Sequence, residues 1–199
     1  MGKSVQALVA LGANLPFEGE TPAGTILQAV KMLAEEGLSV LALSPLYATP
    51  CFPAGAGPDY VNAAAVLQVR PEVDAASILQ RLHQVEGYFG RIREQRWGMR
   101  TLDIDLVGFG DSVLPDAATQ DAWRNLPPEA QARTTPDRLI LPHPRMQDRG
   151  FVLGPLAEIA PGWRHPLTGH NVTRMLADLG PGGLAGMQPM NGMGKRALS

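Results

Sequence analysis

Disulfides, long apolar runs and a strong net charge are all missing from this chain of 199 residues. Cysteine occurs once, as Cys51, so no disulfide can form within the chain, and this favours a reducing compartment, the cytoplasm. No apolar stretch approaches the roughly 20 residues needed to span a bilayer, so we expect no membrane partner. The formal net charge is only -2, which argues against nucleic acid as a partner.

Turn-forming residues are plentiful instead, with 22 glycines and 18 prolines. The length and even composition predict a single domain over residues 1–179. Within it, residues 111–137 carry four prolines and mixed polarity, and we expect a long insertion there with a short helix near residues 117–125. The glycine- and methionine-rich tail, residues 180–199, has little to contribute to a core, so we expect it to be disordered.

Apolar periodicity and capping residues predict the order strand, helix, strand, strand, helix, strand. One helix should begin after Thr21 and end at Gly37, and a second should begin after Asp74 and end at Gly90. This order is typical of an α+β fold, a ferredoxin-like split βαβ sandwich with a mostly antiparallel sheet and helices packed on one sheet face. We expect the strands at residues 4–11, 38–47, 60–69 and 102–109, followed by a short strand at 138–141 and by helices at 150–160 and after residue 171.

Two aspartates, Asp103 and Asp105, occupy alternate positions of the strand predicted at 102–109, so their side chains share one face. Carboxylates so close together repel one another. Binding of Mg²⁺, which typically takes one or two carboxylates plus substrate phosphates, would relieve that repulsion. The alternative is that both side chains merely decorate the solvated face of an edge strand.

An arginine-rich segment precedes this strand. This segment contains Arg91, Arg93, Arg96, Trp97 and Arg100, and Glu86 lies before it on the preceding predicted helix. Guanidinium groups bind phosphate oxygens through planar, bidentate hydrogen bonds. A solvated loop is the simpler interpretation, but four arginines and a tryptophan within ten residues exceed what solubility requires. We therefore favour a phosphate-binding flap beside the acidic strand.

Tyr60 and Asn62, two residues apart on one predicted strand, share a face. An aromatic ring beside an amide is suited to binding a flat heterocycle, although a core tyrosine with a hydrogen-bonded asparagine is the more common case. His143, Arg149 and Phe151 add a second aromatic group further along the chain. No Ser-His-Asp order, P-loop or dinucleotide fingerprint is present, which argues against nucleophilic catalysis and against both nucleotide-binding folds.

Together these residues resemble the 6-hydroxymethyl-7,8-dihydropterin pyrophosphokinase family of folate biosynthesis. The most specific segment is Arg96-Trp97-Gly98-Met99-Arg100-Thr101-Leu102-Asp103-Ile104-Asp105. The other matching segments follow the family order and lie at residues 10–15, 47–50, 58–64, 141–144 and 149–153. An accidental match of the whole set is very improbable.

The resemblance implies transfer of the terminal diphosphate of ATP to the hydroxymethyl oxygen of the dihydropterin, with release of AMP. It implies that Asp103 and Asp105 bind two Mg²⁺ ions and that Arg91 and Arg100 act on the transferring phosphates. Further ATP contacts are implied for Glu86, Arg93, Arg96, Trp97, Leu106, Arg138 and His143. Pterin contacts are implied for Thr49, Pro50, Phe52, Tyr60, Asn62 and Phe151, and Arg149 is a further phosphate or site candidate.

Two other functions fit part of the pattern. A metal-dependent phosphoesterase could use the same aspartate pair, and a non-catalytic nucleotide-binding ferredoxin-like module could retain the pocket without turnover. We expect a monomer, although the sequence leaves a dimer open. The chain departs from the family pattern at Cys51, where a second proline is common, and in the length of the insertion at 111–137. Neither departure touches the expected ligands.

Overall fold

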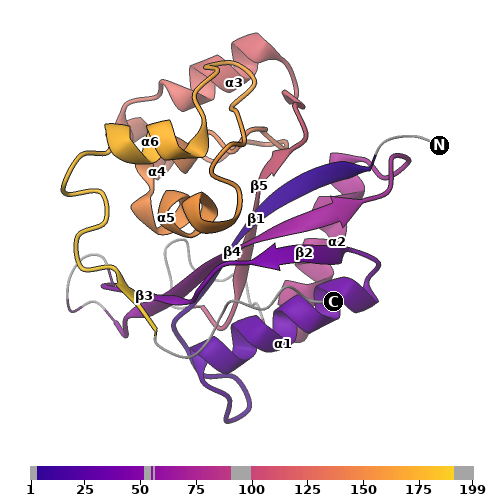
Figure 1. Cartoon of the computed structure of the whole chain (residues 1–199), viewed down its shortest axis with the longest axis vertical. Helices are drawn as coiled ribbons and strands as arrows, with labels where there is room; N and C mark the ends of the chain where they lie inside the picture. Colours follow the sequence, from indigo (N-terminus) through magenta and orange to yellow (C-terminus); the bar gives the residue numbers. More distant parts are fainter. Residues whose placement is uncertain (1–3, 52–54, 56, 91–99, 191–199) are drawn as a thin grey trace.

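Six strands form one sheet in the computed structural model of the chain, which describes residues 4–51, 55, 57–90 and 100–190 (Figure 1). The strands are β1 (Val5–Ala13), β2 (Ser39–Leu43), β3 (Tyr47–Thr49), β4 (Tyr60–Val69), β5 (Asp103–Phe109) and β6 (Gln188–Pro189). The helices are α1 (Pro22–Glu35), α2 (Ala75–Tyr88), α3 (Ala117–Arg124), α4 (Pro128–Arg133), α5 (Gly150–Ile159) and α6 (Val172–Asp178), with a 3-10 turn η1 (Met146–Asp148). Within the described ranges, none of these helices is long and apolar enough to cross a membrane.

The strand pairing confirms the predicted ferredoxin-like topology. The sheet order is β5-β1-β4-β3-β6, with β2 also paired to β4, and every pair is antiparallel. β4 thus lies between β1 and the strands that follow α1, which is the split βαβ arrangement. Both predicted helix starts are confirmed as well, because the side chains of Thr21 and Asp74 accept hydrogen bonds from the backbone N–H groups of Gly24 and Ser77.

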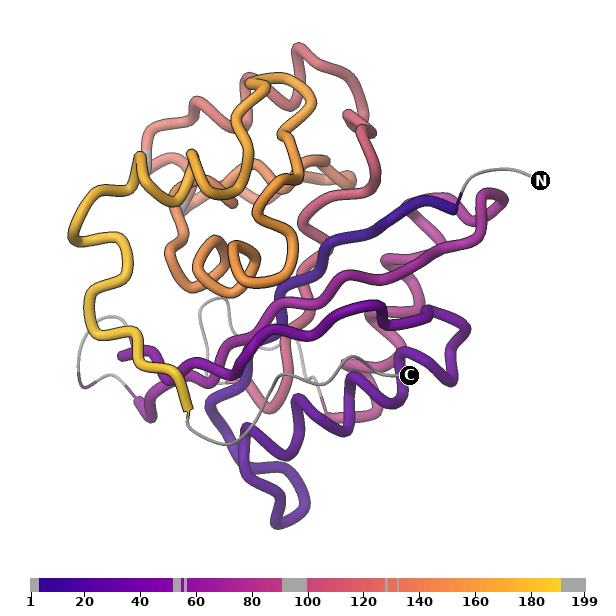
Figure 2. Tube along the Cα trace, in the orientation of Figure 1, coloured from indigo at the N-terminus to yellow at the C-terminus, as the bar shows by residue number. Residues whose placement is uncertain are grey.

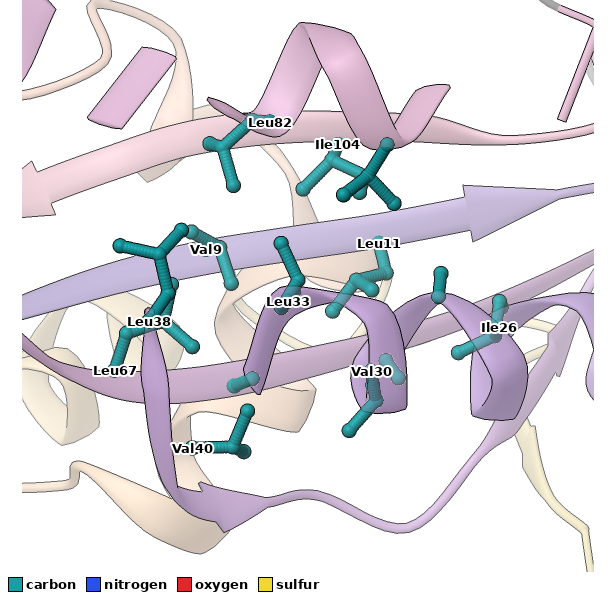
Figure 3. Close-up of a cluster of buried hydrophobic side chains, with 14 of the residues drawn as sticks. Val9, Leu11, Ile26, Val30, Leu33, Leu38, Val40, Leu67, Leu82 and Ile104 are labelled. Atoms are coloured by element: carbon teal, nitrogen blue, oxygen red, sulfur yellow. The ribbon is translucent and has the colours of Figure 1, made fainter. Parts of the chain in front are cut away.

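One face of the sheet is covered by α1 and α2, which enclose the larger core. Figure 3 shows Ile26, Val30 and Leu33 of α1 packed with Val9 and Leu11 of β1, and all five side chains are buried. Burying an aliphatic side chain of this size contributes roughly 1.5–3 kcal/mol. This cluster therefore stabilises the sheet that carries the polar side chains of the candidate active site.

The opposite face is covered by α5 and α6, so the sheet has helices on both faces and not on one face as expected (Figure 1). Leu8 of β1, Val66 of β4 and Val107 of β5 pack in one cluster there with residues of α5 and α6, among them Leu153 and Met175. The physical reason is that these strands carry apolar side chains on both of their faces. A second helical layer is needed to bury the second set.

The single strand expected at residues 38–47 is divided into β2 and β3. Pro45 has no backbone N–H to donate, so the regular strand pairing is interrupted there. Ser44, just before it, still pairs with Ala64 of β4. The Ser44 N–H donates to the carbonyl of Ala64 at 2.9 Å, and its Oγ accepts from the Ala64 N–H at 2.9 Å. The chain then re-enters the sheet as β3, which brings Thr49 opposite Tyr60 at the end of β4.

The insertion at residues 111–137 folds onto the domain. The helix expected near 117–125 is confirmed as α3, whereas α4 was not predicted. Gln120 of α3 is fully buried, and its Nε2 donates to the carbonyl of Pro142 at 3.1 Å. The short strand expected at 138–141 is wrong, since only Leu141 pairs, in an isolated bridge to Leu114, before Pro142 ends the run.

The disorder expected from residue 180 is wrong for residues 180–190. These residues form consecutive turns and then β6, which pairs antiparallel with β3 (Figure 2). The edge of β3 offers backbone hydrogen-bonding groups that order this segment, and Met190 at its end packs against the larger core. Residues 191–199 lie outside the described residues.

Candidate active site

Asp103 and Asp105 lie on the face of β5 that is turned toward α5 and α6. Val107, two residues further on, packs in the core beneath those helices, whereas Ile104 between the aspartates is buried in the opposite core. Their side chains remain partly exposed, at 23% for Asp103 and 39% for Asp105. The predicted sharing of one face is confirmed, and both side chains are partly accessible, although the Oδ1 of Asp103 is buried.

Strand β1 lies between β5, which carries the two aspartates, and β4, which carries the expected pterin ligands Tyr60 and Asn62. In the register of the sheet, Gly12 of β1 lies between Asp103 of β5 and Asn62 of β4. A Cβ atom at Gly12 would lie only 3.0 Å from the Oδ1 of Asn62. The two polar side chains therefore share a row of the sheet with no side chain between them.

Each of the two aspartates is paired with an arginine. Arg100 forms an ion pair with Asp103, and the Nη1 of Arg149 lies 3.5 Å from the Oδ2 of Asp105. The guanidinium of Arg149 also lies 5.7 Å from the ring centroid of Phe151, a cation–π distance. These pairs relieve the repulsion between neighbouring carboxylates and place two guanidinium groups where phosphate is expected.

The carboxylate pair fits a hard divalent cation whose coordination is completed by its substrate. Carboxylate oxygens are the ligands that Mg²⁺ prefers, and it usually takes only one or two of them together with phosphate oxygens and water. Among the residues that the structure describes, no group of three or more His, Cys, Asp or Glu side chains could hold a metal ion. A cation at Asp103 and Asp105 would therefore need phosphate ligands as well.

Tyr60 and Phe151 are the two aromatic side chains predicted to contact the pterin. Burial is the main cause that raises the pKa of Tyr60; Cys51 and Asp103 add to the rise, and Arg100 opposes it. The phenol is therefore within electrostatic range of the Arg100–Asp103 pair. Phe151, in the first turn of a helix that packs on β4, keeps 41% of its surface exposed, which suits a ring that stacks on a ligand.

The loop between β3 and β4 is held at both of its ends. The Nδ2 of Asn62 donates to the Oγ1 of Thr49 at 2.5 Å, in a buried contact. The backbone N–H of Cys51 donates to the Oδ1 of Asp59 at 3.3 Å. The structure thus brings Thr49, Asn62 and the adjoining Pro50 together, as the resemblance implied.

Asn14 was not predicted as a site residue, yet it connects two of the loops. It is 2% exposed; its Oδ1 accepts from the Arg100 N–H at 2.8 Å, and its Nδ2 donates to the carbonyl of Pro58 at 3.2 Å. The same side chain therefore fixes the arginine that pairs with Asp103 and the loop that leads into β4. Asn14 lies in the family-like segment at residues 10–15, but an asparagine just after an apolar strand is equally typical of an ordinary turn, so no role was assigned to it.

Two predicted ATP contacts, Leu106 and Glu86, have side chains in the core. Leu106 is 3% exposed and packs beneath α1 and α2, so its side chain offers no surface to a nucleotide. Glu86 is fully buried on α2, and its Oε1 accepts a hydrogen bond from the Ile104 N–H at 2.7 Å. Because Ile104 lies between the two aspartates on an edge strand, Glu86 fixes the backbone that carries them.

His143 lies in the turn that follows the insertion, and its backbone N–H donates to the carbonyl of Val107 at 2.8 Å. Burial lowers the pKa of His143 to about 4; Asp105 opposes this shift, and Arg149 and Arg145 add to it. The ring is therefore neutral at pH 7. Its Nδ1 accepts from the Arg145 N–H at 3.1 Å, so the proton is carried by Nε2.

The remaining predicted ligands are not brought into the site by a described contact. Arg138 is exposed and forms a bidentate ion pair with Asp137, with both N–O distances at 3.0 Å, so its ATP contact stays a prediction. Thr101 donates its hydroxyl hydrogen to the carbonyl of Phe89, which joins the two ends of the arginine-rich segment. The predicted residues that lie outside the described residues are Phe52, Arg91, Arg93, Arg96 and Trp97.

Known proteins are similar to this chain in sequence and in fold. Residues 8–161 match the family described as 7,8-dihydro-6-hydroxymethylpterin-pyrophosphokinase (HPPK). A 2-amino-4-hydroxy-6-hydroxymethyldihydropteridine pyrophosphokinase of Synechocystis sp. is 35% identical over 170 residues, which cover 85% of this chain and 74% of that protein. The protein of the same name from Pseudomonas aeruginosa is 36% identical over 169 residues, which cover 85% of this chain and 88% of that protein.

A crystal structure of Plasmodium falciparum HPPK-DHPS aligns with 88% of this chain at a TM-score of 0.60 and 15% sequence identity. The aligned part is 45% of that chain, so the present chain spans less than half of that protein's length. At this identity the likeness shows the fold alone. From the sequence match and the shared α+β fold together, the chain belongs to the HPPK family.

Proposed function

We propose that the chain transfers the β- and γ-phosphates of ATP as one group to the hydroxymethyl oxygen of 6-hydroxymethyl-7,8-dihydropterin, in folate biosynthesis. The oxygen forms a bond to the β-phosphorus, the bond from that phosphorus to the bridging oxygen of AMP breaks, and the hydroxyl proton is lost. One observation carries the proposal. Two arginine-paired carboxylates share one sheet face with Asn62, and only Gly12 lies between Asp103 and Asn62 in their row of the sheet.

Asp103 and Asp105 would hold the Mg²⁺ ions, of which two are expected. When bound, Mg²⁺ neutralises phosphate charge and helps to align the reacting groups. Arg100 and Arg149 would exchange their carboxylate partners for phosphate oxygens, which they can bind through two parallel N–H donors. Positioning and electrostatics then supply most of the rate enhancement, and no protein nucleophile is needed. Further phosphate and nucleotide contacts are proposed for Arg91, Arg93, Arg96, Trp97, Arg138 and His143.

The pterin ring would stack between Tyr60 and Phe151. Since the Nδ2 of Asn62 is engaged by Thr49, its Oδ1, which borders the open row at Gly12, remains to accept a hydrogen bond from a ring N–H. A buried amide that is already oriented by one partner selects a ligand with a donor at the right place, because a ligand without it would leave the Oδ1 unpaired. Asn62 would thus recognise the edge of the pterin ring, and the two aromatic side chains would contact its faces.

We further propose that the protein acts as a monomer in the cytoplasm. The described site residues lie on several strands and helices of one chain and in the loops between them, so this part of the site does not require a second copy. Cys51 is free, which suits a reducing compartment.

The first experiment mixes the protein with ATP, Mg²⁺ and the dihydropterin, with a control that lacks the pterin, and identifies the products by chromatography. AMP and the pterin diphosphate, formed together and only with pterin, are expected. Formation of ADP would instead indicate transfer of a single phosphoryl group. Release of inorganic phosphate or pyrophosphate without pterin would favour the phosphoesterase alternative. No nucleotide change with folded protein would favour the non-catalytic binding module.

A further inference from the structure

The C-terminal segment, residues 180–190, follows the residues matched to the family and returns to the sheet (Figure 1, yellow). It leaves α6, passes α5 and ends in β6 beside β3 (Figure 2). None of its residues was predicted to take part in function. Its contacts nevertheless lie at two places that both border the proposed pterin site.

The first place is the N-terminal end of α5, next to Phe151. A Cβ atom at Gly150 would lie 1.6 Å from the carbonyl oxygen of Gly183, so the two backbones touch at this point. One turn later, a Cβ atom at Gly154 would lie 2.9 Å from the Cε of Met187. The C-terminal segment therefore packs directly on the first turns of the helix that presents Phe151.

The second place is the loop between β3 and β4, next to Thr49. Gly186 has a φ of +75°, and a Cβ atom there would lie 2.7 Å from the Cγ of Pro50. The pairing of β6 with β3 and the hydrogen bond from the Met190 N–H to the carbonyl of Leu46, at 2.8 Å, hold the segment against this loop. The proline ring cannot rotate away, so the contact fixes the spacing between segment and loop.

We infer that the C-terminal segment is a brace that sets the distance between the two walls of the pterin site. One wall is the loop with Thr49 and Pro50, the other is the start of α5 with Phe151, and residues 183–187 touch both. The inference rests on the proposed function, because it concerns how the same site recognises the pterin. Gly186 contacts Pro50, which adjoins the proposed pterin ligand Thr49, so we expect this contact to act on pterin binding more than on ATP binding.

The brace is close-packed where it meets both walls. Added Cβ atoms would lie 1.6 Å from the Gly183 carbonyl oxygen at Gly150 and 2.7 Å from the Pro50 Cγ at Gly186, so neither contact has space for a methyl group. Close-packed contacts transmit a displacement, because neighbouring atoms have no space into which to move. A hollow of about 280 Å³, lined by Tyr47, Ala157, Glu158, Leu184, Met187 and neighbouring residues, lies beside the segment between these contacts. A change at Gly186 should therefore act first on the wall that contains Pro50.

The test compares Gly186→Ala with Gly182→Ala in the full chain. At Gly186 the added methyl group meets Pro50 and the backbone has a left-handed conformation that alanine rarely adopts. At Gly182 nothing lies within 4 Å of the added Cβ, so this variant is the matched control. Pterin binding is measured by calorimetry with Mg²⁺ and α,β-methylene ATP, whose bridging carbon blocks the reaction. Binding of the ATP analogue and the Tm are measured in parallel.

Gly186→Ala is expected to weaken pterin binding about tenfold and, because of its local backbone strain, to lower the Tm by about 2–4 °C, while ATP-analogue binding stays close to that of wild type. Gly182→Ala should match wild type throughout. Met187→Ala, which removes the contact with Gly154, should weaken pterin binding to a smaller extent. Unchanged pterin affinity in Gly186→Ala, or equal losses for both ligands, would overturn the brace. If wild-type protein fails to bind the pterin at all, the proposed function itself is refuted.

Discussion

Replacing Asp105 with alanine should lower the rate of the proposed reaction strongly and change the stability of the protein only slightly. The carboxylate lies on the partly exposed face of β5, is 39% exposed and has one recorded ion-pair partner, Arg149 at 3.5 Å. The change removes a proposed Mg²⁺ ligand and leaves Ile104 and Leu106, the core residues on either side, in place.

The expected cost in stability is small. An ion pair with this exposure contributes about 0–1 kcal/mol, and part of that is offset because the repulsion between Asp105 and Asp103 is also removed. For a protein of this size, a change of 1 kcal/mol shifts the Tm by about 2–4 °C. The loss of one preorganised electrostatic contact in a reacting site costs roughly 100- to 1,000-fold in rate. Activity should therefore fall far more than stability.

The assay follows the initial rate of AMP formation as a function of Mg²⁺ concentration, and thermal unfolding gives the Tm. Asp178→Ala is the matched control, because Asp178 is 43% exposed, pairs with Arg174 at 2.9 Å and lies on α6. This control should retain the wild-type rate with a similar change in Tm. An Asp105→Ala protein that turns over at the wild-type rate, with the same Mg²⁺ dependence, would refute the metal assignment.

Three further changes address other parts of the structure. Tyr60→Ala should weaken pterin binding, measured by calorimetry, more than ATP binding, because it removes a stacking surface; equal losses would contradict the stacking role. Glu86→Ala should lower the free energy of unfolding by about 1–3 kcal/mol in a denaturant titration, because the buried Ile104 N–H loses its acceptor. Turnover should fall as well, and an unchanged stability would refute the strand-fixing role. Burial lowers the pKa of His165 from 6.5 to about 4, so the unfolded chain binds more protons in this range and stability should fall as the pH is lowered from about 6.5 to 4. His165→Asn, which does not titrate, should show a shallower fall, and parallel curves for the two proteins would count against the assignment.

Helix starts and strand bounds were predictable where they depend on residues that are only a few positions apart. The caps at Thr21 and Asp74 and the bounds of β4 at residues 60–69 agree with the structure, because capping and apolar periodicity depend on near neighbours. Errors arose where a distant partner decides the outcome. The strand expected at 38–47 is divided at Ser44, which bonds to Ala64 on β4, and the segment expected to be disordered pairs with β3.

The candidate site shows the same division. Asp103 with Asp105 was predictable as a pair because a spacing of two on a strand places side chains on one face. The roles of Asn14 and Glu86 were not predictable, since they depend on Arg100 and Ile104, which are 86 and 18 positions away along the chain. A polar residue that serves a remote backbone group leaves no periodic trace in the sequence.

The sequence by itself determined the family, and it predicted the paired carboxylates and the aromatic and amide side chains of the proposed site, because these depend on residue type and short spacing. Only the tertiary structure decided that helices cover both faces of the sheet, that Gly12 leaves the row between Asp103 and Asn62 bare, and that the C-terminal segment contacts both walls of the proposed pterin site. Each of those outcomes depends on strand register and on contacts between segments far apart in the chain. A register is set by the burial of whole strands at once, which no local stretch of sequence contains.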